Sequence, residues 1–161
     1  MLIVGQTCTP EGRLPDKDKV EKVMKWPLPE TTSQVRGFLG LCGTVRIWIP
    51  GYSQMNRKLT ELYKKDEEFV WTNERIEAFE ALKKAVSSAP ALRSVDYSSD
   101  LAVILAVDTS KYAVGIVLLQ MDELGKRRPA RYGSIPLGPV EGNYSQPKLE
   151  LYGLYRALHA F

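Results

Sequence analysis

The spacing of apolar residues changes along this chain from helical to strand-like. In the first part, one buried helix face is predicted by an i, i+3, i+4, i+7 pattern, made of Val35, Phe38, Leu39 and Cys42. The same periodicity predicts further helices over residues 16–26, 55–63 and 73–88. A turn at residues 9–12 predicts a small hairpin ahead of these helices.

The stretch from Leu101 to Gln120 holds two apolar runs separated by a short polar turn. The first run, residues 101–107, leads directly into Asp108, and the second covers residues 113–119. A continuous apolar run bounded by turn residues is typical of a strand covered on both faces. We therefore expect residues 101–107 to form the central strand of a sheet. A less apolar strand follows at 129–135, and Ser145 is suited to cap a final helix.

These elements predict an α+β fold, with a small N-terminal β-hairpin and a helical region followed by a three-stranded antiparallel sheet with one helix. The chain begins within a predicted strand and ends within a helix that is still apolar. We therefore expect it to be a piece of a longer protein. The edge of a cut sheet also invites pairing with a second copy of the chain.

Composition indicates a globular protein inside the cell. The 161 residues are 44% hydrophobic and 25% charged, which are ordinary values for a domain with a core. No apolar run reaches the roughly 18 residues of a membrane span, and the first residues lack a basic signal-peptide region. We expect no membrane partner and a location inside the cell. The two cysteines, Cys8 and Cys42, are expected to be reduced thiols.

Positive charge is concentrated in the first part of the chain. Residues 1–65 hold 11 Lys and Arg against 6 Asp and Glu, which gives +5, whereas residues 66–161 hold 11 against 13, which gives −2. This asymmetry favours a polyanionic partner for the first part, although a solvated helix face produces the same counts. Three glycines, Gly37, Gly40 and Gly43, recur in one predicted helix, where each costs about 1 kcal/mol. Close packing of a neighbouring helix, or the approach of a nucleic-acid groove, would account for them.

Two carboxylates form the candidate chemical site. Asp108 follows a buried strand, where it either caps its own turn or serves a function. In the final helix, Glu150 falls on the face predicted to pack on the sheet, together with Gly153, Leu154, Ala157 and Phe161. Two acids brought together repel each other unless a cation lies between them, and hard oxygen ligands suit Mg²⁺. The pair therefore favours a metal site.

Six strings of this sequence, taken in order, cover nearly the whole chain. They are VGQTCTPEGRLPDKDKVEKVMKWPLP, VRGFLGLCGTVRIWIPGYS, LTELYKKDEEFVWT, AFEALKKAVSSAPAL, AVDTSKYAVGIVLLQ and VEGNYSQPKLELYGLYRAL. Together they resemble the Pol polyprotein of gypsy-type LTR retrotransposons, from the end of the reverse transcriptase to the start of its ribonuclease H domain.

The resemblance implies a division of the chain into four parts. Residues 1–15 would end the polymerase palm, and residues 16–65 would form the helical thumb. Residues 66–100 would be the connection, and residues 101–161 the N-terminal part of a ribonuclease H-like domain. The partners implied are an RNA–DNA hybrid or template–primer duplex and the remainder of the Pol polyprotein. The thumb positions that match the family's duplex contacts are Trp26, Arg36, Gly40 and Arg46.

The resemblance also implies a role for the two acids. Asp108 and Glu150 match the first and second catalytic acids of the nuclease, which would hold Mg²⁺, or Mn²⁺ in its place, for cleavage of RNA in the hybrid. The family's polymerase aspartates are absent from this chain, and its remaining nuclease acids lie on elements beyond the first nuclease helix. We therefore expect weak metal binding and no hydrolysis by this chain alone. The alternative is a non-catalytic remnant that binds nucleic acid or another protein.

Overall fold

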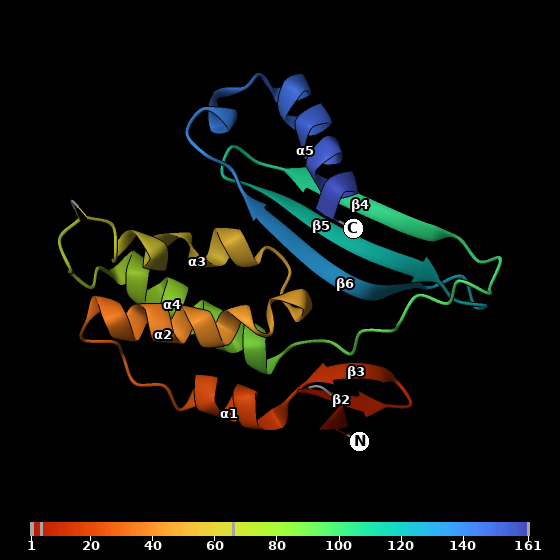
Figure 1. Ribbon diagram of the computed structural model, residues 1–161, viewed down its shortest axis with the longest axis horizontal. Helices are drawn as coiled ribbons and strands as arrows, with labels where there is room; N and C mark the ends of the chain where they lie inside the picture. The colour runs from red at the N-terminus through yellow and green to blue at the C-terminus, as the bar shows by residue number, and fades with distance from the viewer. Residues whose placement is uncertain (1, 4, 66, 161) are drawn as a thin grey trace.

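The chain folds into a helical unit and a sheet unit that pack against each other (Figure 1). The computed structural model describes residues 2–3, 5–65 and 67–160. The helical unit holds β1 (Leu2–Ile3), β2 (Gln6–Thr9), β3 (Gly12–Pro15), α1 (Lys17–Met24), α2 (Thr32–Gly43), the 3-10 helix η1 (Arg46–Trp48), α3 (Tyr52–Glu61) and α4 (Asn73–Ser87). The sheet unit holds β4 (Val103–Thr109), β5 (Ala113–Met121), β6 (Arg127–Pro136), the 3-10 helix η2 (Glu141–Asn143) and α5 (Gln146–Ala160). The predicted α+β class is confirmed.

An aromatic core holds the helical unit together. The rings of Phe38 in α2 and Phe79 in α4 lie 4.5 Å apart between centroids. Trp48 is only 2% exposed, and its indole Nε1 donates a 2.9 Å hydrogen bond to the carbonyl of Arg13 in the hairpin. The predicted face of α2 is confirmed, because all four of its apolar residues are buried. Helix α2 begins after Thr31, whose hydroxyl accepts a hydrogen bond from the Gln34 amide.

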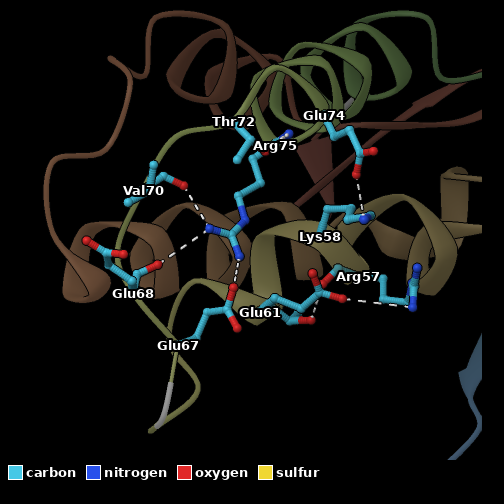
Figure 2. Close-up of polar contacts among 10 residues, drawn as sticks. Arg57, Lys58, Glu61, Glu67, Glu68, Val70, Thr72, Glu74 and Arg75 are labelled. Carbon is cyan, nitrogen blue, oxygen red and sulfur yellow. Dashed lines mark hydrogen bonds and ion pairs between the residues drawn. The ribbon is translucent and has the colours of Figure 1, made fainter.

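Helix α4 buries a charged residue that periodicity did not predict. Arg75 is 7% exposed, whereas its apolar neighbour Ile76 is 37% exposed. The Arg75 guanidinium donates a 2.8 Å hydrogen bond to the carbonyl of Val70 and forms an ion pair with Glu67 (Figure 2). A buried cation is tolerated here because these oxygens replace its water. Arg75 thereby holds the segment of residues 67–70 against the start of α4.

The central strand of the second sheet is β5, not the strand formed by the first apolar run. The sheet has the order β4-β5-β6, with both pairs antiparallel. Strand β4 therefore lies at an edge, and Val103 is 48% exposed. An apolar run gives no information on how many neighbours a strand has, and this explains the wrong prediction for residues 101–107.

Helix α5 covers one face of this sheet (Figure 1), and its buried stripe shares only Gly153 and Ala157 with the one predicted. Its buried positions are Leu149, Gly153 and Ala157, whereas Glu150 and Leu154 are exposed. The expectation that Glu150 packs on the sheet is therefore wrong. Burying Leu149 instead avoids the cost of dehydrating a carboxylate. Phe161, the last residue of the predicted stripe, lies outside the described residues.

Polar contacts join the two units along β6 and the β4–β5 turn. In α3, the Ser53 amide donates to Ser134 Oγ and its hydroxyl donates to the Ser134 carbonyl, both at 3.1 Å. The next residue, Gln54, donates from Nε2 to Ser110 Oγ at 3.0 Å. Helix α3 is thus fixed beside the turn that follows Asp108.

The approach of α5 to β4 depends on a glycine. A Cβ added at Gly153 would lie 1.8 Å from Thr109 Oγ1 and 3.0 Å from Thr109 Cβ. A change of the Thr109 rotamer could move the hydroxyl away, but it could not move Cβ. By contrast, a Cβ added at Gly40 in α2 would meet no atom within 4 Å.

We predict opposite effects of alanine at these two helix positions. Gly153→Ala should lower the thermal midpoint, since overpacking costs about 1–3 kcal/mol and outweighs the gain in helix propensity of about 1 kcal/mol. Gly40→Ala should raise the midpoint, because it gains helix propensity without a clash. Unfolding followed by circular dichroism measures both. Equal stabilisation by the two substitutions would contradict the close contact.

Candidate functional site

The first candidate acid, Asp108, lies near the end of edge strand β4 and is exposed. Its neighbour Thr109 is buried under α5. Because successive residues of a strand point to opposite faces, Asp108 is not covered by that helix. Within the described part of the chain, no hydrogen bond or ion pair involves the Asp108 side chain. This carboxylate is therefore available to a ligand.

The second candidate acid, Glu150, lies in the first turns of α5 and is also exposed. It precedes Gly153 by nearly one helical turn, and Gly153 contacts Thr109, the residue after Asp108. Glu150 therefore lies on the helix that packs against the end of β4, whereas Asp108 lies on the opposite face of that strand. The Glu150 carboxylate accepts a 3.1 Å hydrogen bond from Gln146 Nε2, and no cationic side chain neutralises it among the residues described.

The donor set suits a hard divalent cation only in part. Two exposed carboxylates without a cationic partner provide oxygen ligands of the kind that Mg²⁺ and Mn²⁺ prefer. Across residues 2–3, 5–65 and 67–160, no group of three or more His, Cys, Asp or Glu is placed to hold a metal ion. Within those residues, Asp108 and Glu150 therefore have no third His, Cys, Asp or Glu beside them to complete a metal site.

Cysteine and histidine do not add to this site. Burial raises the pKa of the Cys42 thiol to about 12, so the group is protonated and inert at neutral pH. The single histidine, His159, is exposed near the end of α5, and its ring packs edge-on against Tyr155 with centroids 4.5 Å apart. Both side chains pack against other parts of the protein, and neither has a catalytic partner in the described chain.

The four proposed duplex contacts differ in exposure. Arg36 and Gly40 lie on the exposed side of α2, and Arg46 is exposed in η1. Trp26 is half-buried, with its ring 6.1 Å from that of Phe38 and its carbonyl accepting a hydrogen bond from Lys83. Trp26 therefore packs on the core, whereas the other three are open to a partner.

The three glycines of α2 have different surroundings. An added Cβ would lie 3.5 Å from the Trp26 ring at Gly37 and 3.6 Å from the Tyr52 hydroxyl at Gly43. These two positions agree with close internal packing. Gly40 has open space beside it, so no neighbouring element of the described chain accounts for a glycine there.

The structure also contains a basic cleft that the sequence did not indicate. It has a volume of about 630 Å³ and lies between α3, the β4–β5 turn and the segment after β6. Its cationic lining residues are Arg57, Lys64 and Lys111. Arg57 and Lys64 belong to the helical unit and Lys111 to the sheet unit, so the cleft exists only because the two units pack together. The only hint of it in the sequence is the spacing of Arg57 and Lys64, which is that of one helix face.

None of the helices in the described ranges is long and apolar enough to cross a bilayer.

Comparison with known proteins identifies relatives of both units. Transposon Tf2-3 polyprotein and Transposon Tf2-4 polyprotein of Schizosaccharomyces pombe are each 32% identical over 155 residues. The alignments cover 96% of this chain and 12% of each polyprotein, so the chain spans about an eighth of the length of these relatives. The predicted relationship to retrotransposon polyproteins is confirmed, and these matches do not favour the alternative of a non-catalytic remnant.

Solved structures show the same fold at low sequence identity. The foamy viral protease-reverse transcriptase dRH in complex with ds DNA has a TM-score of 0.83 and 20% identity, covering 99% of this chain and 28% of that chain. The foamy viral protease-reverse transcriptase in complex with RNA/DNA hybrid has the same TM-score and identity and covers 99% and 21%.

A family model for the RNase H-like domain found in reverse transcriptase matches residues 71–161. This range includes α4, the whole sheet unit and both candidate acids. The chain therefore belongs to the family of RNase H-like domains found in reverse transcriptase.

Proposed function

We propose that this chain is the segment of a retrotransposon reverse transcriptase that joins duplex binding to cleavage of RNA in an RNA–DNA hybrid. In this proposal residues 1–15 end the palm, 16–65 form the thumb, 66–100 the connection and 101–161 the nuclease part. The remainder of the polyprotein would be its covalent partner. The observation that supports the proposal is the contact of Gly153 with Thr109, which joins the helix of Glu150 to the end of the strand that carries Asp108.

Asp108 and Glu150 would together hold one Mg²⁺ or Mn²⁺ ion. When bound, such an ion activates water and stabilises the leaving oxygen of a phosphodiester. The protein's own contribution is to hold the two carboxylates on rigid elements and to leave both open to the substrate. Two protein ligands are fewer than a tight site needs, so this chain alone would bind the ion weakly.

The duplex would lie across the exposed side of α2 and η1. Arg36 and Arg46 are exposed there, and no acidic partner neutralises either of them among the residues described. Gly40, with open space beside it, would let a sugar–phosphate backbone approach the helix closely. Phosphate contacts of this kind set affinity and register without distinguishing base sequence.

The metal site is tested by titrating Mg²⁺ or Mn²⁺ into the chain and recording amide NMR spectra. We predict changes centred on Asp108 and Glu150 at concentrations on the order of millimolar. Asp108→Asn should abolish them, because it removes one of two anionic ligands. The matched control, Glu123→Gln, alters an exposed acid on the β5–β6 hairpin and should leave the response intact. A response that survives Asp108→Asn would overturn the assignment.

Duplex binding is tested with a labelled RNA–DNA hybrid, by anisotropy at several salt concentrations. We predict that Arg36→Gln combined with Arg46→Gln weakens binding and makes the salt dependence less steep by about 1.8 in log–log slope, since each lost contact removes about 0.9. The control, Lys126→Gln with Arg127→Gln, removes two exposed charges from the β5–β6 hairpin and should change neither quantity. The same loss in both variants would argue against a specific surface.

A further inference from the structure

The cleft beside α3 is built from four separate segments. One wall is a single face of α3 and the residues after it, from Ser53 to Lys64. The opposite side is formed by the β4–β5 turn, the residues that follow β6, and η2. Its volume of about 630 Å³ lies within the range of about 300–1,000 Å³ that is usual for ligand sites.

The charges that face this cleft are mainly positive. Arg57, Lys64 and Lys111 line it together with one acid, Glu61. Arg57 lies 3.8 Å from the Glu61 carboxylate, at the long limit of an ion pair (Figure 2). Neither Lys64 nor Lys111 forms an ion pair with any described residue. Two exposed ammonium groups are therefore left for an anionic ligand.

Tyr112 holds two of the cations in place. The Arg57 guanidinium carbon lies 4.0 Å from the centroid of its ring, and Lys111 Nζ lies 4.9 Å from it. A hydrogen bond from Lys111, together with the nearby positive charges, lowers the pKa of the Tyr112 hydroxyl. The ring supports cations and so is not left open for stacking on a base.

The walls of the cleft are fixed by contacts within the protein. Gln54 in α3 is bonded to Ser110 of the turn. The Leu137 amide donates a 2.8 Å hydrogen bond to the Tyr112 carbonyl. In η2, Gly142 lies so near the turn that an added Cβ would be 2.5 Å from the Lys111 carbonyl oxygen. The segments that carry Arg57 and Lys111 are therefore fixed before any ligand arrives, which reduces the entropy lost on binding.

We propose that this cleft binds the sugar–phosphate backbone of a nucleic-acid strand and leads it toward Asp108. The helical part of the α3 wall, residues 53–61, is about 12 Å long at 1.5 Å per residue, and Lys64 lies beyond its end. That length suits more than one phosphate of a strand better than one small anion. The turn that carries Lys111 begins directly after the strand of Asp108. The inference extends the proposed function to a second contact surface, and it rests on that function.

The test removes the two cations of the cleft that form no ion pair with a described residue. Lys64→Gln with Lys111→Gln should weaken binding of a labelled RNA–DNA hybrid several-fold at low salt and reduce the log–log salt slope by about 1.8. Both side chains are exposed, and among the described residues the Lys111 side chain contacts only its neighbour Tyr112, so the fold should be unaffected. Lys126→Gln with Arg127→Gln again serves as the charge-matched control. A salt slope equal to that of the control would overturn the inference while leaving hybrid binding itself intact.

A second measurement separates the cleft from the proposed function. A single-stranded (dT)8 oligonucleotide should shift the amide NMR signals of Lys111, Tyr112 and Asn143 in the wild-type chain, and the double variant should lose this response. If the hybrid fails to bind but the oligonucleotide produces these shifts, the result contradicts the proposed function and supports strand binding in the cleft. If inorganic phosphate produces the same shifts at the same concentration, the site holds single anions and the strand proposal is wrong. No shift with the oligonucleotide also overturns it.

Discussion

The close contact between α5 and the end of β4 is the constraint on which the candidate site depends. A helix normally lies farther from a sheet, because side chains on both surfaces separate the two backbones. At Gly153 the absent side chain lets Thr109 occupy the space beside the helix backbone. This contact positions the first turns of α5, and with them Glu150, relative to the strand that carries Asp108. Any residue larger than glycine would alter that position.

Each unit has its own hydrophobic core, Tyr132 of β6 packs against the core of the helical unit, and polar contacts add to this junction. Ser53 and Gln54 of α3 bond to Ser134 and Ser110 of the sheet unit. Such bonds are directional, so they specify an orientation as well as contributing to stability. These contacts therefore fix the helical unit, with its proposed duplex surface on α2 and η1, relative to the sheet unit that carries the candidate acids. The basic cleft lies along the same junction.

The elements that sequence predicts well are those with one apolar face. Helix α2 is such a case, since its other side is polar or glycine and only one stripe can be buried. Helix α5 is different, because Leu151, Leu154 and Leu158 are apolar but exposed. With apolar residues on several sides, periodicity could not select the stripe of Leu149, Gly153 and Ala157.

Three features of the structure could not be predicted from local sequence patterns. The position of β4 at the sheet edge follows from pairing, which an apolar run does not encode. Burial of Arg75 depends on the carbonyl of Val70 and on Glu67, and neither can be inferred from helical spacing. The basic cleft requires α3 and the β4–β5 turn to meet. Both candidate acids were selected from the sequence, but Glu150 was selected on a helix face that is not the buried one, and the role of the pair stays a prediction.

The central claim is that the sheet unit holds Asp108 and Glu150 as ligands of one divalent ion. The most direct test is a crystal structure of the chain soaked in Mn²⁺, with the metal located by its anomalous scattering. The account predicts one manganese peak with carboxylate oxygens of both Asp108 and Glu150 in its coordination sphere. A peak bound by only one of the two acids, or none beside them at a concentration that fills other surface sites, would contradict it.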